Sequence, residues 1–212
     1  MFNIKFTKEL PSVLTEPNHS PVEDAHEVQY VPRMKTLGFC TTGVLLLLMG
    51  FCGAWRIRQI PHEPLQRDLL CILLIISLAI AFVPCPYIHE LIHAFAYPKR
   101  AEKLIILSKG KGLTCYIYCE AEVSRLRLIL IYLLPLFLMG LLPFAILMWI
   151  SPNIPYVISV SLLPSLLYLV FIASIDVSNA LMIATRKLPR GAKLFLRGSH
   201  LYCRFEQNIK QE

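Results

Sequence analysis

Apolar residues along this chain are gathered into four long runs and do not recur with the period of an amphipathic helix or strand. The runs cover residues 37–55, 69–97, 128–150 and 156–184, and Pro84 and Pro86 interrupt the second. A helix of about 20 apolar residues is long enough to cross the hydrocarbon core of a bilayer. The pattern therefore predicts an all-α polytopic membrane protein with about four transmembrane helices.

The longest polar connection, residues 98–127, lies between the second and third runs. Within it, the segments LIILS (104–108) and LTCYIYCE (113–120) are rich in β-branched and aromatic residues, and KGKG (109–112) between them supplies a turn. This predicts a β-hairpin between helices 2 and 3. AKLFL (192–196) and LYCRF (201–205) repeat the pattern more weakly.

Three regions follow from these patterns. Residues 1–33 are polar and contain prolines, which predicts a flexible N-terminal tail. Residues 34–185 form the four-helix membrane domain, and residues 186–212 form a basic C-terminal tail. The first residues, MFNIKFTKELPS, include no apolar segment of the kind that a secretory signal peptide needs.

Composition agrees with a membrane location. Hydrophobic residues make up 56% of the chain and charged residues 17%, where an ordinary soluble domain has about 25% charged residues. Of the 21 lysines and arginines, eighteen lie before the first apolar run, in the 98–127 loop or in the C-terminal tail, which four spans place on one side, and three lie in the first loop. This bias predicts a multi-pass protein of the cell membrane with both termini and the β-hairpin in the cytoplasm. Basic loops beside anionic lipid headgroups account for the net charge of +7, so the lipid bilayer is an expected partner and nucleic acid is not.

The second apolar run ends in a motif that carries chemistry, HELIH at residues 89–93. On a helix, His89 and His93 are one turn apart and share a face, so both imidazoles can reach one metal ion. Glu90 stands beside the first histidine, where a carboxylate can act as the general base that activates water. Two histidine ligands and a glutamate base are the working parts of a zinc peptidase. The structural alternative is a pair of hydrogen-bonded histidines at the membrane edge.

A catalytic zinc ion takes three protein ligands, so a third must come from elsewhere in the chain. The carboxylate candidates are Asp176, Glu120, Glu122 and Glu63, with His62 beside the last. Asp176 is the one carboxylate in an otherwise uncharged stretch from residue 128 to residue 185. At a rise of 1.5 Å per residue, the histidines lie about 9–15 Å and Asp176 about 15 Å from the same predicted boundary. Asp176 is therefore the predicted third ligand of Zn²⁺, and the alternative is a polar packing residue.

The seven cysteines suggest no disulfide framework. Cys115 and Cys119 have a spacing that zinc sites use, but there is no second pair of the same kind. We interpret them as small residues of the hairpin.

HELIH (89–93), SRLRLILIYLLP (124–135), SIDVSNA (174–180) and LPRG (188–191) together resemble the pattern of the small bacterial putative zincin peptidases with four spans. That family is related to the site-2-protease-like intramembrane zinc metalloproteases. The resemblance covers roughly residues 70–205. The chain departs from the site-2 proteases at the third ligand, because Asp176 is followed by Val177 and not by glycine. Asn179 comes after the aspartate and is a candidate helper in catalysis.

The predicted function is that of an intramembrane zinc metallopeptidase. It would hydrolyse membrane-anchored or membrane-inserting polypeptides, with His89, His93 and Asp176 as zinc ligands and Glu90 as the general base. The hairpin is expected to offer an open edge to an extended substrate strand. The alternative is a non-catalytic membrane adaptor, or pseudoprotease, that binds membrane peptides. A metal transporter is disfavoured, because the spans contain no further carboxylates or histidines that could form a relay.

Overall fold

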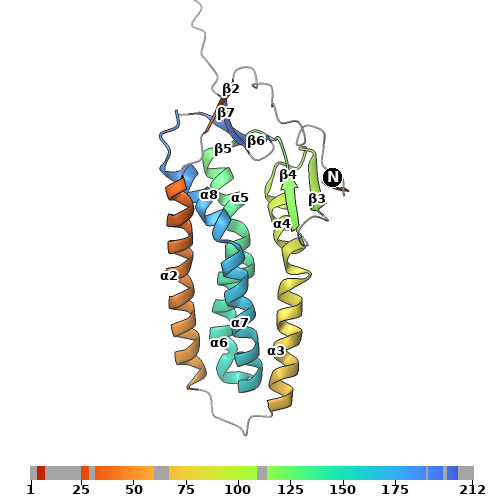
Figure 1. The fold of residues 1–212 in the computed structure, drawn as a ribbon, viewed down its shortest axis with the longest axis vertical. Coiled ribbons are helices and arrows are strands. Elements are labelled where there is room, and N and C mark those ends of the chain that lie inside the picture. The colour runs from red at the N-terminus through yellow and green to blue at the C-terminus, as the bar shows by residue number, and fades with distance from the viewer. Residues whose placement is uncertain are drawn as a thin grey trace, which may run out of the picture.

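The computed structural model describes residues 4–7, 25–28, 32–59, 67–108, 114–189, 191–197 and 200–204. Four of its helical segments are long and apolar enough to cross a membrane: 32–57, 68–96, 125–153 and 156–185. They run side by side as a bundle, and the strands gather at one end of it (Figure 1). The predicted four helices are thus confirmed, and a multi-pass membrane protein is compatible with them. Their insertion and orientation stay predictions.

The first two segments differ in continuity. The first is a single helix, α2 (Pro32–Ile57). The second consists of α3 (Arg67–Phe82) and α4 (Cys85–Ala96), joined by a turn at Val83 and Pro84. The Pro84 carbonyl accepts hydrogen bonds from the N–H groups of Tyr87 and Ile88, both at 3.1 Å, and so starts α4. The expected proline interruption is therefore the boundary at which the HELIH helix begins.

The third and fourth segments are also composite. Helix α5 (Arg125–Pro135) passes into a π-helix, η1 (Leu136–Leu141), then into α6 (Leu142–Ile150) and a short 3₁₀ turn, η2 (Ser151–Asn153). Helix α7 (Tyr156–Ile172) is followed by α8 (Ser174–Thr185), and a turn at Ala173 separates them. Asp176 lies in the first turn of α8. The sequence predicts one continuous helix here, because no proline or glycine marks the break at Ala173.

The strands form two small sheets. One has the order β1-β3-β4, in which β1 (Ile4–Thr7) pairs in parallel with β3 (Lys103–Ser108), and β3 pairs antiparallel with β4 (Thr114–Tyr118). The other has the order β2-β7-β6-β5. Its strands are β2 (Ala25–Glu27), β5 (Val123–Ser124), β6 (Lys193–Arg197) and β7 (His200–Arg204).

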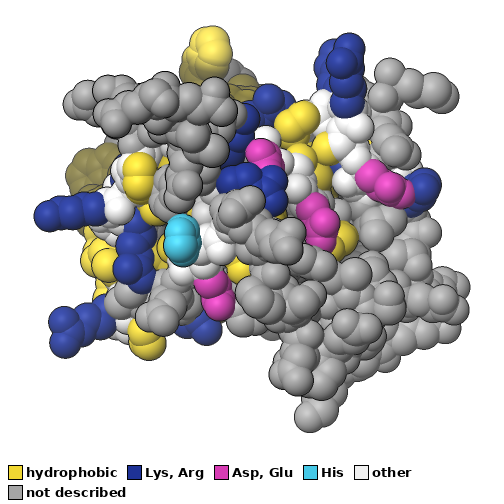
Figure 2. All heavy atoms as spheres, turned by 90° about the horizontal axis from the view of Figure 1, so that it is seen from above, with side chains coloured by type: hydrophobic (Ala, Val, Ile, Leu, Met, Phe, Trp, Pro, Cys, Tyr) yellow, Lys and Arg dark blue, Asp and Glu magenta, His cyan; other side chains and the backbone are white. Residues whose placement is uncertain are grey.

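The fold is therefore mostly helical and carries more strand structure than one hairpin. The pairing of β3 with β4 confirms the predicted hairpin, and β6 with β7 forms the second one. Two short parts of the N-terminal region, expected to be flexible, form β1 and β2. The end view in Figure 2 shows lysine and arginine side chains around the sheets. Exposed examples are Lys5, Lys99 and Arg100.

Small and polar residues line the contacts between the helices, whereas their outer faces are apolar. Gly38 of α2 lies so close to α8 that a β-carbon at this position would be 2.6 Å from Ser178 Cα. The Ser77 hydroxyl of α3 donates to the Ser161 carbonyl of α7 at 2.8 Å and accepts from Ser165 at 3.0 Å. Large apolar side chains such as Trp149 (82% exposed) point outward. This arrangement suits a bundle surrounded by lipid, where interfaces favour small residues.

Candidate metal centre

Helix α4 presents two buried imidazoles on one face. His89 and His93 are 8% and 4% exposed, and their rings meet edge to face with centroids 4.8 Å apart. Cys85, one turn before His89, lies buried on the same face. The spacing of four residues, which suggested a shared face in the sequence, therefore places both imidazole Nε2 atoms together, 3.2 Å apart.

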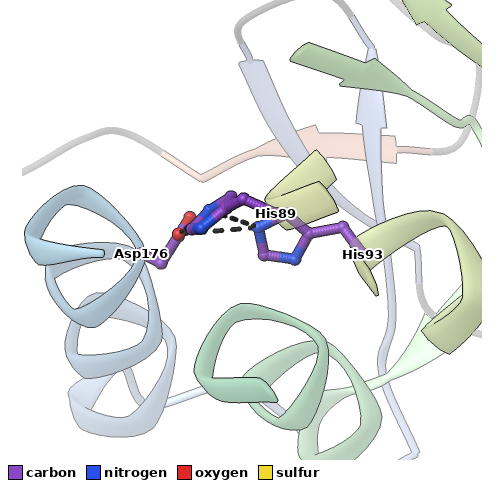
Figure 3. Close-up of side chains that lie close together, drawn as sticks. All are labelled: His89, His93 and Asp176. Atoms are coloured by element: carbon purple, nitrogen blue, oxygen red, sulfur yellow. Dashed lines mark hydrogen bonds and ion pairs between the residues drawn. The ribbon is translucent and has the colours of Figure 1, made fainter. Parts of the chain in front are cut away.

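Asp176 reaches these histidines from the opposite helix, α8 (Figure 3). Its Oδ2 atom lies 2.8 Å from His89 Nε2 and 3.5 Å from His93 Nε2. The carboxylate is itself nearly buried, at 9% exposed. The structure thus brings together the three residues that the sequence singled out as ligands, although 83 positions of the chain separate His93 from Asp176.

A backbone carbonyl fixes the orientation of His93. His93 Nδ1 lies 2.8 Å from the carbonyl oxygen of Ile131 in α5. Because a carbonyl only accepts, Nδ1 carries the proton and donates it, which leaves the Nε2 lone pair directed at Asp176 and His89. In an α-helix, this carbonyl would accept from the residue four places on, but that residue is Pro135, which has no N–H. The proline therefore leaves the Ile131 carbonyl available to the histidine.

These three side chains fit a zinc ion. Two imidazole nitrogens and a carboxylate oxygen bind zinc at about 2.0–2.2 Å, and a tetrahedral arrangement then places the ligand atoms about 3.3–3.6 Å from each other. Of the three separations here, 3.2 and 3.5 Å agree with this range, and the separation of 2.8 Å between His89 and Asp176 must widen by about half an ångström. Three protein ligands also leave a fourth position open, as in catalytic zinc sites. Within the described residues, these three form the group that could hold a metal ion.

Glu90 lies on the neighbouring part of α4 and contacts the sheet. Its Oε2 atom accepts a hydrogen bond of 3.0 Å from the backbone N–H of Ile117 in β4. The carboxylate is half-buried and follows His89 directly. The predicted base is thus beside the ligand group, in the space between α4 and β4.

Two arginines hold the ends of the helices that carry the ligands. The Arg127 guanidinium donates to the carbonyl of Ala96, the last residue of α4, at 3.2 Å. Arg125 donates to the carbonyl of Ala184 at the end of α8. Carbonyls in the last turn of a helix have no partner within the helix, and a cation stabilises them. The two arginines at the start of α5 therefore hold the C-terminal ends of α4 and α8 against α5.

Two tyrosines border the centre. The Tyr132 ring lies edge to face against His93, with centroids 6.2 Å apart. Tyr97 caps the C-terminus of α4 and is 3% exposed. Burial raises the pKa of the Tyr97 hydroxyl well above its usual value, so this group stays neutral.

The other ligand candidates lie elsewhere. Glu120 is exposed and bonded to the Tyr118 hydroxyl, and Glu122 pairs with Arg204. His62 and Glu63 are outside the described residues. Cys119 is buried, and burial raises the pKa of its thiol, which disfavours the thiolate form that zinc binds. Asn179, two residues from the buried Val177, is half-buried on α8.

Comparison with known proteins identifies the family. Residues 82–185 match the sequence model of the family described as Putative zincin peptidase. Over these residues, the chain belongs to that family. The matched segment begins just before α4 and ends with α8, so it contains the HELIH helix, the β3–β4 hairpin and Asp176. No match was found among curated proteins or among solved structures.

Membership of this family suggests a metallopeptidase and implies zinc as the cofactor. It agrees with the resemblance drawn from the motifs. The further relation to site-2 proteases stays a prediction. Sequence reasoning missed two contacts of the centre, because both use backbone groups, the Ile131 carbonyl and the Ile117 N–H. Pro135, four residues after Ile131, was the only signal that could have suggested the first.

Proposed function

We propose that this protein is an intramembrane zinc metallopeptidase related to the site-2 proteases. The observation that carries this proposal is the convergence of His89 Nε2, His93 Nε2 and Asp176 Oδ2, buried in a bundle of four apolar helices. Ionisable groups at membrane depth are costly and mark functional sites. The family match supports peptidase chemistry.

In the proposed reaction, His89, His93 and Asp176 hold the zinc ion. Zinc, when bound, supplies Lewis-acid polarisation and lowers the pKa of water. The Glu90 carboxylate takes a proton from the attacking water molecule as the oxygen of that water bonds to the peptide carbonyl carbon. Glu90 then gives the proton to the leaving amine nitrogen as the C–N bond breaks. The Ile131 carbonyl keeps the His93 ring in the orientation that this arrangement needs.

The proposed substrate is a membrane-anchored or membrane-inserting polypeptide in an extended conformation. Helical peptide bonds are shielded, so a substrate segment must unwind to be cut. Strand β1 already pairs with one edge of β3, and β4 forms the other edge of this sheet among the described residues. A substrate strand could therefore add to β4. We place the sheets and both termini in the cytoplasm of a cell-membrane protein, on the basis of the lysine and arginine bias.

The test of the ligands is the zinc content of the full-length protein, purified in detergent. We expect one zinc ion per chain in the wild type and its loss in the His93→Ala and Asp176→Ala variants. Retention of zinc without Asp176 would refute the three-ligand centre.

The test of the chemistry compares Glu90→Gln with the wild type. The amide keeps the shape of the side chain but cannot take a proton, so we expect the variant to bind zinc and to cleave nothing. New N-termini can be labelled in membranes of cells that express each form. They should appear in membrane-anchored proteins with the wild type only. Full biological activity of Glu90→Gln would favour the adaptor function.

A further inference from the structure

Among the described residues, strand β4 forms an edge of its sheet, and this edge is hydrogen-bonded to the proposed base, Glu90. Ile117 pairs with Ile105 across the β3–β4 ladder, and its N–H donates to Glu90 Oε2 at 3.0 Å. In an antiparallel pair, the N–H and C=O of one residue point to the same side, and successive residues alternate. The N–H of Ile117 is engaged by Glu90, so both of its backbone groups face away from β3 and toward α4.

An edge strand offers such outward N–H and C=O groups to another strand. The outward groups of Ile117 lie beside Glu90, which directly follows His89 in the chain. A peptide that paired with β4 here would therefore pass the ligand group of His89, His93 and Asp176. In the structure, however, the Glu90 carboxylate occupies the position that a carbonyl of this peptide would take at the Ile117 N–H.

We propose that Glu90 and the substrate backbone compete for the N–H of Ile117, so that docking of an extended peptide releases the base. This inference rests on the proposed peptidase function. At rest, the Glu90 side chain bridges α4 and β4. When a peptide carbonyl takes over the Ile117 N–H, the carboxylate is free to turn toward the peptide bond beside it. Strand β4 thus binds the substrate and also holds the base until the substrate is present.

The resting contact can be tested without a ligand. Hydrogen exchange of the Ile117 amide, measured at single-residue resolution in detergent, should be slow in the wild type. Exchange should remain slowed in Glu90→Gln, because the amide oxygen still accepts, and become faster in Glu90→Ala. Equal exchange in all three proteins would overturn the proposal.

The competition can be tested with two hydroxamates that share a zinc-binding head. One is acetohydroxamate, and the other is N-acetyl valyl-threonyl-valine hydroxamate, which adds a peptide arm that can pair with β4. The ratio of their affinities for the zinc-loaded protein isolates the contribution of the arm. In Glu90→Ala, the carboxylate no longer competes with the peptide arm for the Ile117 N–H. Because a hydrogen bond to a charged group is strong, we expect the affinity ratio to rise about tenfold in this variant. Glu90→Gln should be intermediate, since a neutral oxygen is a weaker acceptor.

Two variants of the strand complete the design. Ile117→Pro removes the N–H and should abolish the advantage of the peptide arm, whereas Ile117→Ala keeps the N–H and should retain it. A ratio that is the same in Glu90→Ala and in the wild type would refute the competition. Failure of both hydroxamates to bind the zinc-loaded wild type would instead count against the proposed peptidase function, so the two failures are distinguishable.

Discussion

Pro135 should control the metal centre through a backbone carbonyl that it leaves without a helical partner. Its missing N–H leaves the Ile131 carbonyl to His93 Nδ1, which donates to it at 2.8 Å. In a Pro135→Ala variant, the new N–H lies four residues after Ile131 and competes for the same carbonyl. We expect the bond to His93 to lengthen, and the imidazole to become free to rotate away from Asp176 and His89.

The variant should change stability and metal affinity in opposite directions. Proline inside a helix is about 3 kcal/mol less favourable than alanine, so the free energy of unfolding should rise by up to about 3 kcal/mol. Loss of an outer partner of a metal-binding histidine typically costs about 10–100-fold in metal affinity. The dissociation constant for zinc should therefore rise by about this factor while the metal-free protein becomes more stable.

Zinc affinity would be measured by competition with a chelator, and stability by thermal unfolding of the metal-free protein in detergent. Pro164, which lies inside α7, provides the matched control: Pro164→Ala should gain stability and keep its zinc affinity. Wild-type zinc affinity in Pro135→Ala would refute the role of the Ile131 carbonyl. Loss of affinity in both variants would show that straightening any span disturbs the centre.

Two further predictions concern the contacts that hold the ligand helices. Gly38→Ala would place a β-carbon 2.6 Å from Ser178 Cα, about 0.9 Å inside an ordinary carbon contact. Helix α8 must then move, so we expect a loss of about 1–3 kcal/mol in thermal unfolding and weaker zinc binding. Gly43→Ala, with nothing within 4 Å, should change neither, and equal behaviour of the two would contradict this packing. Arg127→Leu removes the bond to the Ala96 carbonyl and should lower stability by less than about 1 kcal/mol, with a greater effect at low salt than at high salt.

The positions of the helices along the chain could be predicted because they depend on local composition. Four apolar runs are long enough to span a bilayer, and prolines mark where the second is broken at Pro84. The β3–β4 hairpin could be predicted from the β-branched and aromatic residues on both sides of the KGKG segment. The break between α7 and α8 at Ala173 was missed, since nothing in the local sequence interrupts helical propensity there.

The candidate site was predictable to the extent that it depends on side-chain chemistry. His89, Glu90 and His93 lie within five consecutive residues of one helix, so the geometry of the helix fixes their relation. Asp176 could be paired with them because charged groups are rare at membrane depth, and two antiparallel spans bring equal depths together. The structure places it 2.8 Å from His89, as that argument requires.

By itself, the sequence determined the class of the protein, the helices and the residues that can hold a metal ion, because these depend on residue type and on spacing along one helix. Only the tertiary structure decided how the centre is supported. The carbonyl of Ile131 and the N–H of Ile117 act on His93 and Glu90 from other elements. Backbone groups are the same at every residue, so no side-chain pattern shows which of them will be free to make such a contact.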